Sequence, residues 1–249
     1  MQTKTRPRFL LYFPLLVATL GSPSTGRAQP APTKVKKVTA LPSQNAVFSD
    51  LGNHGVEAPA ISNMVAQGIM KPVSVGIFNP DGVVTRGDFA TMVQSLYKLG
   101  KPSETVSFSD IKSTDPLFSA IQAMAPFMNR QVMCKGCALT TNFSPNAALS
   151  REEASIILVR IMGAKNQLQP MTSQELSSFL QSTPDAKNWK PAAAPYFALA
   201  IKSGVMPLLG DNTFQPALKL TRADTAVLLD NINRQFIVPI KPPVLVQPK

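Results

Sequence analysis

The sequence predicts a mainly α-helical protein (fold class all-α) built from one helix-loop-helix unit used three times. A Phe-x-Pro triplet occurs three times, and in each copy an arginine follows eight residues after the phenylalanine. The arginine lies in a block of the form hydroxyl-Arg-x-acid, and apolar residues follow that block at helical spacing. A recurring pattern of this kind indicates a repeat architecture. The triplets are Phe78-Asn79-Pro80, Phe143-Ser144-Pro145 and Phe214-Gln215-Pro216.

Residues 1–28 have the pattern of a secretory signal peptide. Basic residues without an acid precede a short apolar run, and Gly26-Arg27-Ala28 offers small residues at a cleavage site. The run contains Pro14 and is shorter than the ~18 residues that a transmembrane helix needs. We therefore expect an exported protein of the cell envelope, in the wall, at the surface or in the periplasm, with no integral membrane segment after cleavage. An uncleaved signal anchor is the alternative.

The segments on either side of the repeats are predicted to lack regular structure. Residues 29–46 read as a disordered lead-in, and residues 237–249 as a Pro-rich, extended tail. The three units are expected at residues 47–100, 107–164 and 172–236.

The second helix of each unit is predicted to begin at the hydroxyl-Arg-x-acid block. Thr85, Ser150 and Thr221 are suitable N-caps, and the acid three residues later completes a capping box. Each cap is worth roughly 1 kcal/mol. The apolar stripes that follow are expected to form the core rather than a cofactor site, for example Phe89, Met92, Val93 and Leu96 in the first unit.

A first helix is predicted upstream of each Phe-x-Pro triplet. Apolar residues at helical spacing precede Gly68 and Gly204, which suit the left-handed end of a helix. Phe48-Ser49-Asp50 and Phe108-Ser109-Asp110 mark the starts of the first two units. The arginine spacing puts Phe179-Leu180-Gln181 at the third start and matches Phe118 with Trp189, and Thr172-Ser173-Gln174-Glu175 predicts an extra short helix before it.

The composition favours an anionic partner and excludes several chemistries. Without residues 1–28, 21 basic and 14 acidic residues leave a formal charge of +7, so an acidic polysaccharide is a suitable partner. No basic-aromatic motif indicates nucleic acid binding. Cys134 and Cys137 have no second pair, and His54 is the single histidine, so neither a metal site nor another cofactor is expected. A disulfide joining the two cysteines is the favoured interpretation, with free thiols as the alternative.

An enzyme is not expected. One histidine cannot serve three equivalent sites, and no serine lies in a nucleophile elbow. Adjacent carboxylates such as Glu152 and Glu153 point in different directions on a helix. A calcium loop around Gly82 would need a ligand at Ile77, whose side chain cannot coordinate calcium.

The order of these blocks resembles the S-layer homology (SLH) domain family over residues 47–236. The strongest copy combines Gly68-Ile69, Phe78-Asn79-Pro80-Asp81 and Val84-Thr85-Arg86-Gly87-Asp88-Phe89. The resemblance implies three tandem repeats in a pseudo-threefold arrangement around a central three-helix bundle. It also implies non-covalent attachment to an anionic cell-wall polysaccharide bearing pyruvyl ketals.

The resemblance further implies which residues bind that polysaccharide. Matched to the family pattern, Arg86, Arg151 and Arg222 are the expected anion contacts. A guanidinium at a helix N-terminus is chemically suited to a carboxylate. Asp50 and Asp110 are the expected groove acids, and Trp189 is the expected sugar-facing aromatic residue.

The copies depart from the family pattern, so the three grooves are not expected to be equal. Gly55 replaces an aromatic residue in the first unit. In the third unit Gln181 replaces the groove acid, with Asp185 as an out-of-register substitute. Each arginine could instead have a purely structural role. The alternative function is therefore a structural or protein-binding envelope module, with an envelope protein as partner and little affinity for glycan.

Overall fold

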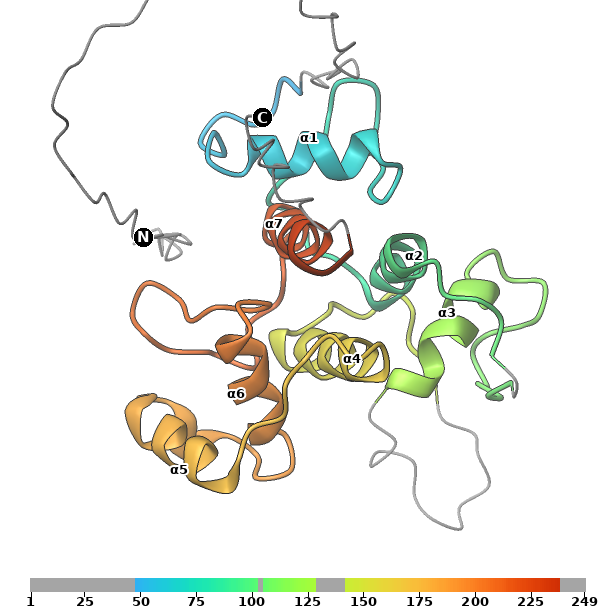
Figure 1. Ribbon diagram of the computed structural model, residues 1–249. Coiled ribbons are helices and arrows are strands. Elements are labelled where there is room, and N and C mark those ends of the chain that lie inside the picture. Colours follow the sequence, from blue (N-terminus) through green and yellow to red (C-terminus); the bar gives the residue numbers. More distant parts are fainter. Residues whose placement is uncertain (1–47, 103–104, 129–141, 238–249) are drawn as a thin grey trace, which may run out of the picture.

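The structure is a computed structural model that describes residues 48–102, 105–128 and 142–237 (Figure 1). The predictions for the signal peptide, the lead-in, the cysteine pair and almost all of the tail lie outside these residues. The mainly α-helical class is confirmed, because the described residues form helices joined by loops with isolated β-bridges. None of the helices in these ranges is long and apolar enough to cross a membrane. The α-helices are α1 (Ala58–Ala66), α2 (Arg86–Tyr97), α3 (Phe118–Met124), α4 (Arg151–Ala164), α5 (Ser173–Ser182), α6 (Ala194–Lys202) and α7 (Arg222–Ile232).

Three short helices of other types accompany these elements. The 3₁₀ helix η1 (Ala125–Phe127) continues α3, η3 (Ala186–Asn188) precedes α6, and the π-helical segment η4 (Asn233–Ile237) continues α7.

The predicted helix starts are confirmed for the second helix of every unit. Thr85, Ser150 and Thr221 cap α2, α4 and α7, and in each case both hydrogen bonds of the capping box are present. The arginine is therefore the first helical residue in all three copies. The extra helix α5 is confirmed too, with Thr172 and Glu175 forming its capping box.

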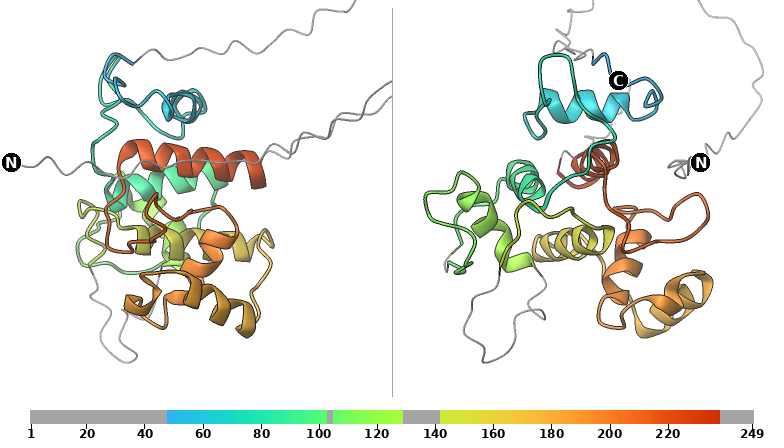
Figure 2. Two further views of the ribbon diagram at one scale, coloured as in Figure 1. Left: turned by 90° about the vertical axis from the view of Figure 1, so that its left-hand side faces the viewer. Right: turned by 180° about the vertical axis from the view of Figure 1, so that it is seen from behind.

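The outer helix of each unit packs on the central helix of another unit. In Figure 1, α2, α4 and α7 lie at the centre, and α1, α3 and α6 lie outside them. The α1 helix contacts α7, α3 contacts α2, and α6 contacts α4. Each outer helix therefore packs on the central helix of the preceding unit, and the first unit closes onto the third. The side view and the view from behind in Figure 2 show the same arrangement.

The segments that enter the central helices are hydrogen-bonded in a closed cycle. The Val84 N–H donates to the Leu220 carbonyl (3.0 Å), the Leu220 N–H to the Leu149 carbonyl (3.1 Å), and the Leu149 N–H to the Val84 carbonyl (2.9 Å). One residue from each unit takes part. Since backbone groups buried between the units need partners, this cycle fixes the relative register of the three units.

The phenylalanines of the three triplets anchor the core. Phe78, Phe143 and Phe214 are fully buried. Phe48 packs on Phe78 and Phe108 packs on Phe143, with ring centroids 5.6 and 5.5 Å apart. In the third unit the partners of Phe214 are instead two aromatic residues, Trp189 at 5.5 Å and Phe197 at 4.8 Å.

The predicted register of the third unit is wrong. Phe179 lies in α5, and Thr183 occupies the buried position that Phe48 has in the first unit, two residues before the aspartate. The predicted match between Phe118 and Trp189 is also wrong, because Phe118 begins α3 whereas Trp189 precedes α6. The physical reason is the inserted helix α5, which displaces the start of the third unit along the sequence. The end of the unit is unaffected, because Phe214 and Arg222 keep the eight-residue spacing found in the other two copies.

The attachment of α5 should depend on pH. Glu175 accepts a hydrogen bond from Lys202 of α6 (2.6 Å), and this contact, with the capping bonds to Thr172, lowers the pKa of Glu175 from 4.5 to about 2. Because the pKa is lower in the folded state, the stabilisation is complete above pH 4.5 and is lost as the pH falls towards 2. We expect amide exchange of α5 to accelerate over this range at low salt, before that of α4. The pH dependence should disappear in Glu175→Gln, and an unchanged profile would contradict the assignment.

Candidate functional site

The three arginines make the same inter-unit contact. The Nε–H of Arg86 donates to the Phe143 carbonyl (2.8 Å), that of Arg151 to Phe214 (2.7 Å), and that of Arg222 to Phe78 (2.8 Å). Each guanidinium also lies over the ring of the same phenylalanine, at 5.0, 4.8 and 4.5 Å from the centroid. We call each of these contacts an arginine junction. At every junction the arginine joins the start of one central helix to the Phe-x-Pro loop of the next unit.

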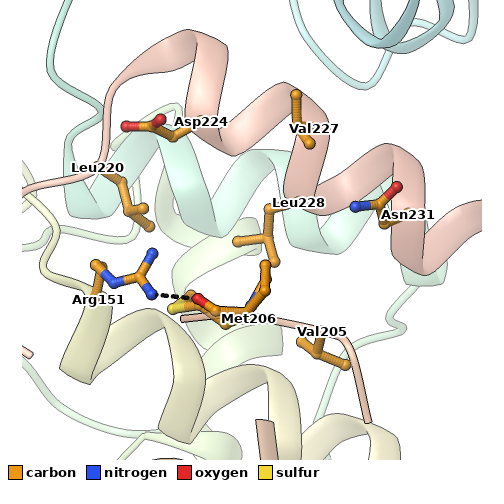
Figure 3. Close-up of a pocket in the computed structure, with 9 residues that line it drawn as sticks. Arg151, Val205, Met206, Leu220, Asp224, Val227, Leu228 and Asn231 are labelled. Carbon is orange, nitrogen blue, oxygen red and sulfur yellow. Dashed lines mark hydrogen bonds between the residues drawn. The ribbon is translucent and has the colours of Figure 1, made fainter. Parts of the chain in front are cut away.

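The Arg151 junction is closed to solvent. Its side chain is fully buried, and a second nitrogen donates to the Pro207 carbonyl (2.7 Å). Figure 3 shows the guanidinium directed at the chain segment beside Met206, beneath α7. The cavity beside it measures about 10 Å³, room for one water molecule at most. A sugar carboxylate cannot reach this arginine in the observed conformation.

Burial affects the charge of Arg151 without removing it. Desolvation lowers the pKa of the guanidinium to about 10, and the negative charges of Asp224 and Asp185 oppose that shift. The arginine therefore stays protonated at neutral pH. Its buried charge is compensated by two carbonyls and the face of Phe214, which are the contacts such a charge requires.

The Arg86 junction already contains a carboxylate. Arg86 Nη1 forms an ion pair with Glu153 Oε1, and the Arg86 side chain is 17% exposed. The other carboxylate oxygen of Glu153 accepts from the N–H and hydroxyl of Ser150 in the capping box of α4. An external anion at this junction would share the guanidinium with Glu153.

The Arg222 junction is partly exposed to solvent. Arg222 donates to the Lys71 carbonyl (2.6 Å) in a solvent-exposed contact. Desolvation lowers the pKa of Arg222, while the charges of Asp88 and Asp50 act in the opposite direction. The contact is made by the backbone carbonyl of Lys71, which is an exposed residue.

The aspartates predicted as groove acids hold the Phe-x-Pro loops. Asp50 accepts from the Phe78 and Asn79 N–H groups (3.0 and 2.6 Å), and Asp110 accepts from Phe143 and Ser144 (both 2.7 Å). The second N–H in each pair belongs to a residue with left-handed backbone, φ 59° at Asn79 and 57° at Ser144. The carboxylates thus stabilise a conformation that non-glycine residues seldom adopt.

In the third unit the carboxylate that holds the Phe-x-Pro loop belongs to Asp185, and Gln181 does not take this position. Asp185 accepts from the Phe214 and Gln215 N–H groups (3.0 and 2.9 Å), and Gln215 has a φ of 50°. The out-of-register substitute considered from the sequence is therefore the true counterpart of Asp50. For Asp50, burial raises the pKa, but the backbone hydrogen bonds and the charge of Arg222 outweigh it, and the pKa lies below its usual value.

Trp189 lies in the core of the third unit. The residue is 6% exposed and packs edge-on against Phe197 and Phe214, with centroids 5.3 and 5.5 Å away. It offers no open ring face for a sugar in this conformation. In the third-unit register Thr183 stands where Phe48 stands in the first unit, and the indole ring of Trp189 packs on Phe214.

The residues considered for other chemistries do not converge. Among the described ranges no group of three or more His, Cys, Asp or Glu side chains could hold a metal ion. His54 Nε2 lies 3.4 Å from Asp81, and its Nδ1 lies 3.8 Å from Glu57, near the start of α1. The cysteine pair predicted to form a disulfide lies outside the described residues.

Comparison with known proteins places the repeats in a family context. The family described as S-layer homology domain matches residues 47–90 and 182–226. The surface-layer 125 kDa protein of Lysinibacillus sphaericus is 28% identical over 177 residues, 70% of this chain and 14% of that protein. An amylopullulanase of Thermoanaerobacterium thermosulfurigenes is 25% identical over 73% of this chain and 9% of its own length.

An exoglucanase, XynX of Acetivibrio thermocellus, is 24% identical over 78% of this chain and 17% of its own length. The chain therefore spans less than a fifth of each of these three relatives. One relative is named as a surface-layer protein and two are named as enzymes. The similarity thus concerns only a small part of each of those proteins.

Proposed function

Because this chain belongs to the S-layer homology domain family, whose domains bind cell-wall polymers, we propose that it attaches non-covalently to an anionic, pyruvylated wall polysaccharide. We further propose that it is exported and acts without catalysis. The observation that carries the proposal is the Arg222 junction, where a partly exposed guanidinium at the N-terminus of α7 donates to the Lys71 carbonyl in a solvent-exposed contact. Helix N-termini and guanidinium groups both favour carboxylates.

The junctions are proposed to contribute unequally. Arg222 is the main anion contact, and Arg86 is a weaker one because a ligand carboxylate must compete with Glu153. Arg151 is fully buried, and we assign it to the stability of the fold. Asp50 and Asp110 act by holding the loops whose carbonyls position the arginines. Trp189 also supports the third loop, by packing on the Phe214 ring inside the core.

Sedimentation with purified cell walls tests this function. We expect Arg222→Gln to lower the affinity about tenfold or more, as the loss of one charge-assisted hydrogen bond would do. Arg86→Gln should have a smaller effect, and the double variant the largest. Lys165→Gln removes one positive charge at the exposed C-terminal end of α4, away from the junctions, and serves as the matched control. A pyruvylated disaccharide should release the protein, and walls stripped of acid-labile ketals should not bind it.

One observation favours the alternative of a structural or protein-binding envelope module. All three arginines already donate to carbonyls within the chain. If the Arg86/Arg222 double variant is folded and sediments with walls as the unchanged protein does, the arginine site is wrong and this alternative gains support. Recovery of chemically altered glycan after incubation would instead indicate an enzyme.

A further inference from the structure

The interface between α1 and α7 contains a groove lined by both apolar and polar side chains. The groove has a volume of about 190 Å³ and lies where the first unit closes onto the third. Its apolar lining comes from Val56, Pro59, Ala60 and Val227. Its polar lining consists of Glu57, Asp224, Asp230, Asn231 and Arg234.

Equivalent positions in the other interfaces are apolar or filled. The residue that caps the outer helix is Glu57 for α1, but Leu117 for α3 and Ala193 for α6. Leu117 lies very close to α2: a Cβ atom added to Gly87 of α2 would lie only 2.8 Å from Leu117 Cδ1. At the α2–α3 interface the Leu117 side chain therefore occupies the space that corresponds to the open space beside Glu57 at the α1–α7 interface.

The polar character continues along the same interface. The ninth residue of the central helix is Asp230 in α7, whereas it is Gln94 in α2 and Val159 in α4. Asp230 is 3% exposed, accepts from Asn63 of α1 and pairs with Arg234 (2.7 Å). Buried polar groups cost free energy unless they are satisfied, and the α4–α6 interface packs with Val159 in that place. The repeat can therefore pack stably without the buried polar groups that the α1–α7 interface contains.

The lining suits a sugar ring without negative charge. Carboxylate, amide and guanidinium groups can each bind neighbouring hydroxyls, and the apolar floor can contact the carbon-bound hydrogens of a ring. The charged groups of the lining are three carboxylates (Glu57, Asp224 and Asp230) and one guanidinium (Arg234), so the lining has a formal net charge of −2. A carboxylate would be repelled here, in contrast to the Arg222 junction. The volume is below the ~300 Å³ of typical ligand pockets, so it suits one ring rather than an oligosaccharide.

We propose that the α1–α7 groove binds one uncharged or amine-bearing sugar residue of the wall polysaccharide. This inference rests on the proposed function, since the polymer is the same. Glu57 and Asn231 are the specificity-determining residues, and Asp230 is a positioning residue that orients Arg234. The anionic sugar and the uncharged one are thus bound at separate places on the protein.

The test uses N-acetylglucosamine, glucosamine and glucuronic acid at millimolar concentration. We expect the first two to shift the backbone amide resonances of Ala60, Val227 and Asn231 in NMR spectra, and glucuronic acid to leave them unchanged. Glu57→Leu copies the residue of the α2–α3 interface, so it should fold, fill the groove and abolish the shifts. Asn231→Ala should weaken binding about tenfold. Glu175→Gln on α5 is the control for loss of a carboxylate.

The outcomes separate this inference from the proposed function. Equal shifts with glucuronic acid, shifts that persist in Glu57→Leu, or the absence of any shift would overturn the groove assignment. These NMR measurements use free sugars and need no cell walls. If the unchanged protein fails to sediment with walls, the proposed function fails, whatever the sugars do at the groove. If it sediments and Glu57→Leu sediments equally well, the groove is not part of the wall-binding surface.

Discussion

Replacing Arg151 by alanine is expected to lower the free energy of unfolding by about 3–5 kcal/mol, the range for breaking a buried charge interaction. The substitution leaves the Phe214 and Pro207 carbonyls without their guanidinium donor, and both lie at the interface of the second and third units. It also creates a cavity beside Phe214, because the side chain is fully buried. Urea unfolding followed by circular dichroism measures the change.

Two variants show whether the effect comes from burial. Arg151→Lys keeps the charge, but an ammonium group cannot reproduce the planar fork and the stacking on Phe214, so we expect an intermediate loss. Arg222→Ala removes the same contact at a partly exposed junction and should cost less than half as much. Equal losses for Arg151→Ala and Arg222→Ala would contradict the structural role assigned to Arg151.

The contrast among the arginines illustrates what the sequence could and could not predict. The repeat predicted that Arg86, Arg151 and Arg222 begin helices, because capping is a local property of four consecutive residues. It could not predict their exposure, which depends on carbonyls of another unit. Pro207 reaches Arg151 across 56 residues, and Lys71 reaches Arg222 across 151. Equal sequence motifs therefore gave unequal sites.

The groove residues were missed for a related reason. Glu57 and Asp230 differ from the residues at the equivalent positions of the other units, and a repeat is recognised from the positions that match. A usable signal was present, since both are charged at positions where other copies have apolar or uncharged residues. Their closeness in space, however, depends on the closure of α1 onto α7, which sequence spacing does not reveal.

Replacing Asp185 by alanine is expected to cost about 3 kcal/mol, since each hydrogen bond to a charged group contributes about 1.5–3 kcal/mol. The carboxylate accepts from the Phe214 and Gln215 N–H groups and holds Gln215 in left-handed geometry. Without it, two part-buried donors lose their acceptor and the loop is free to leave that conformation. Because the Phe214 carbonyl also accepts from Arg151, loosening this loop should weaken the Arg151 junction as well.

Gln181→Ala provides the matched control, because the sequence spacing assigned Gln181 to the position that Asp185 occupies. Gln181 is an exposed residue of α5, so its replacement should change the free energy of unfolding by less than about 0.5 kcal/mol. Combining Asp185→Ala with Arg151→Ala should give less than the sum of the two single losses, since both act on the Phe214 loop. Full additivity would show that carboxylate and guanidinium stabilise the loop independently, and a large effect of Gln181→Ala would restore the register predicted from the sequence.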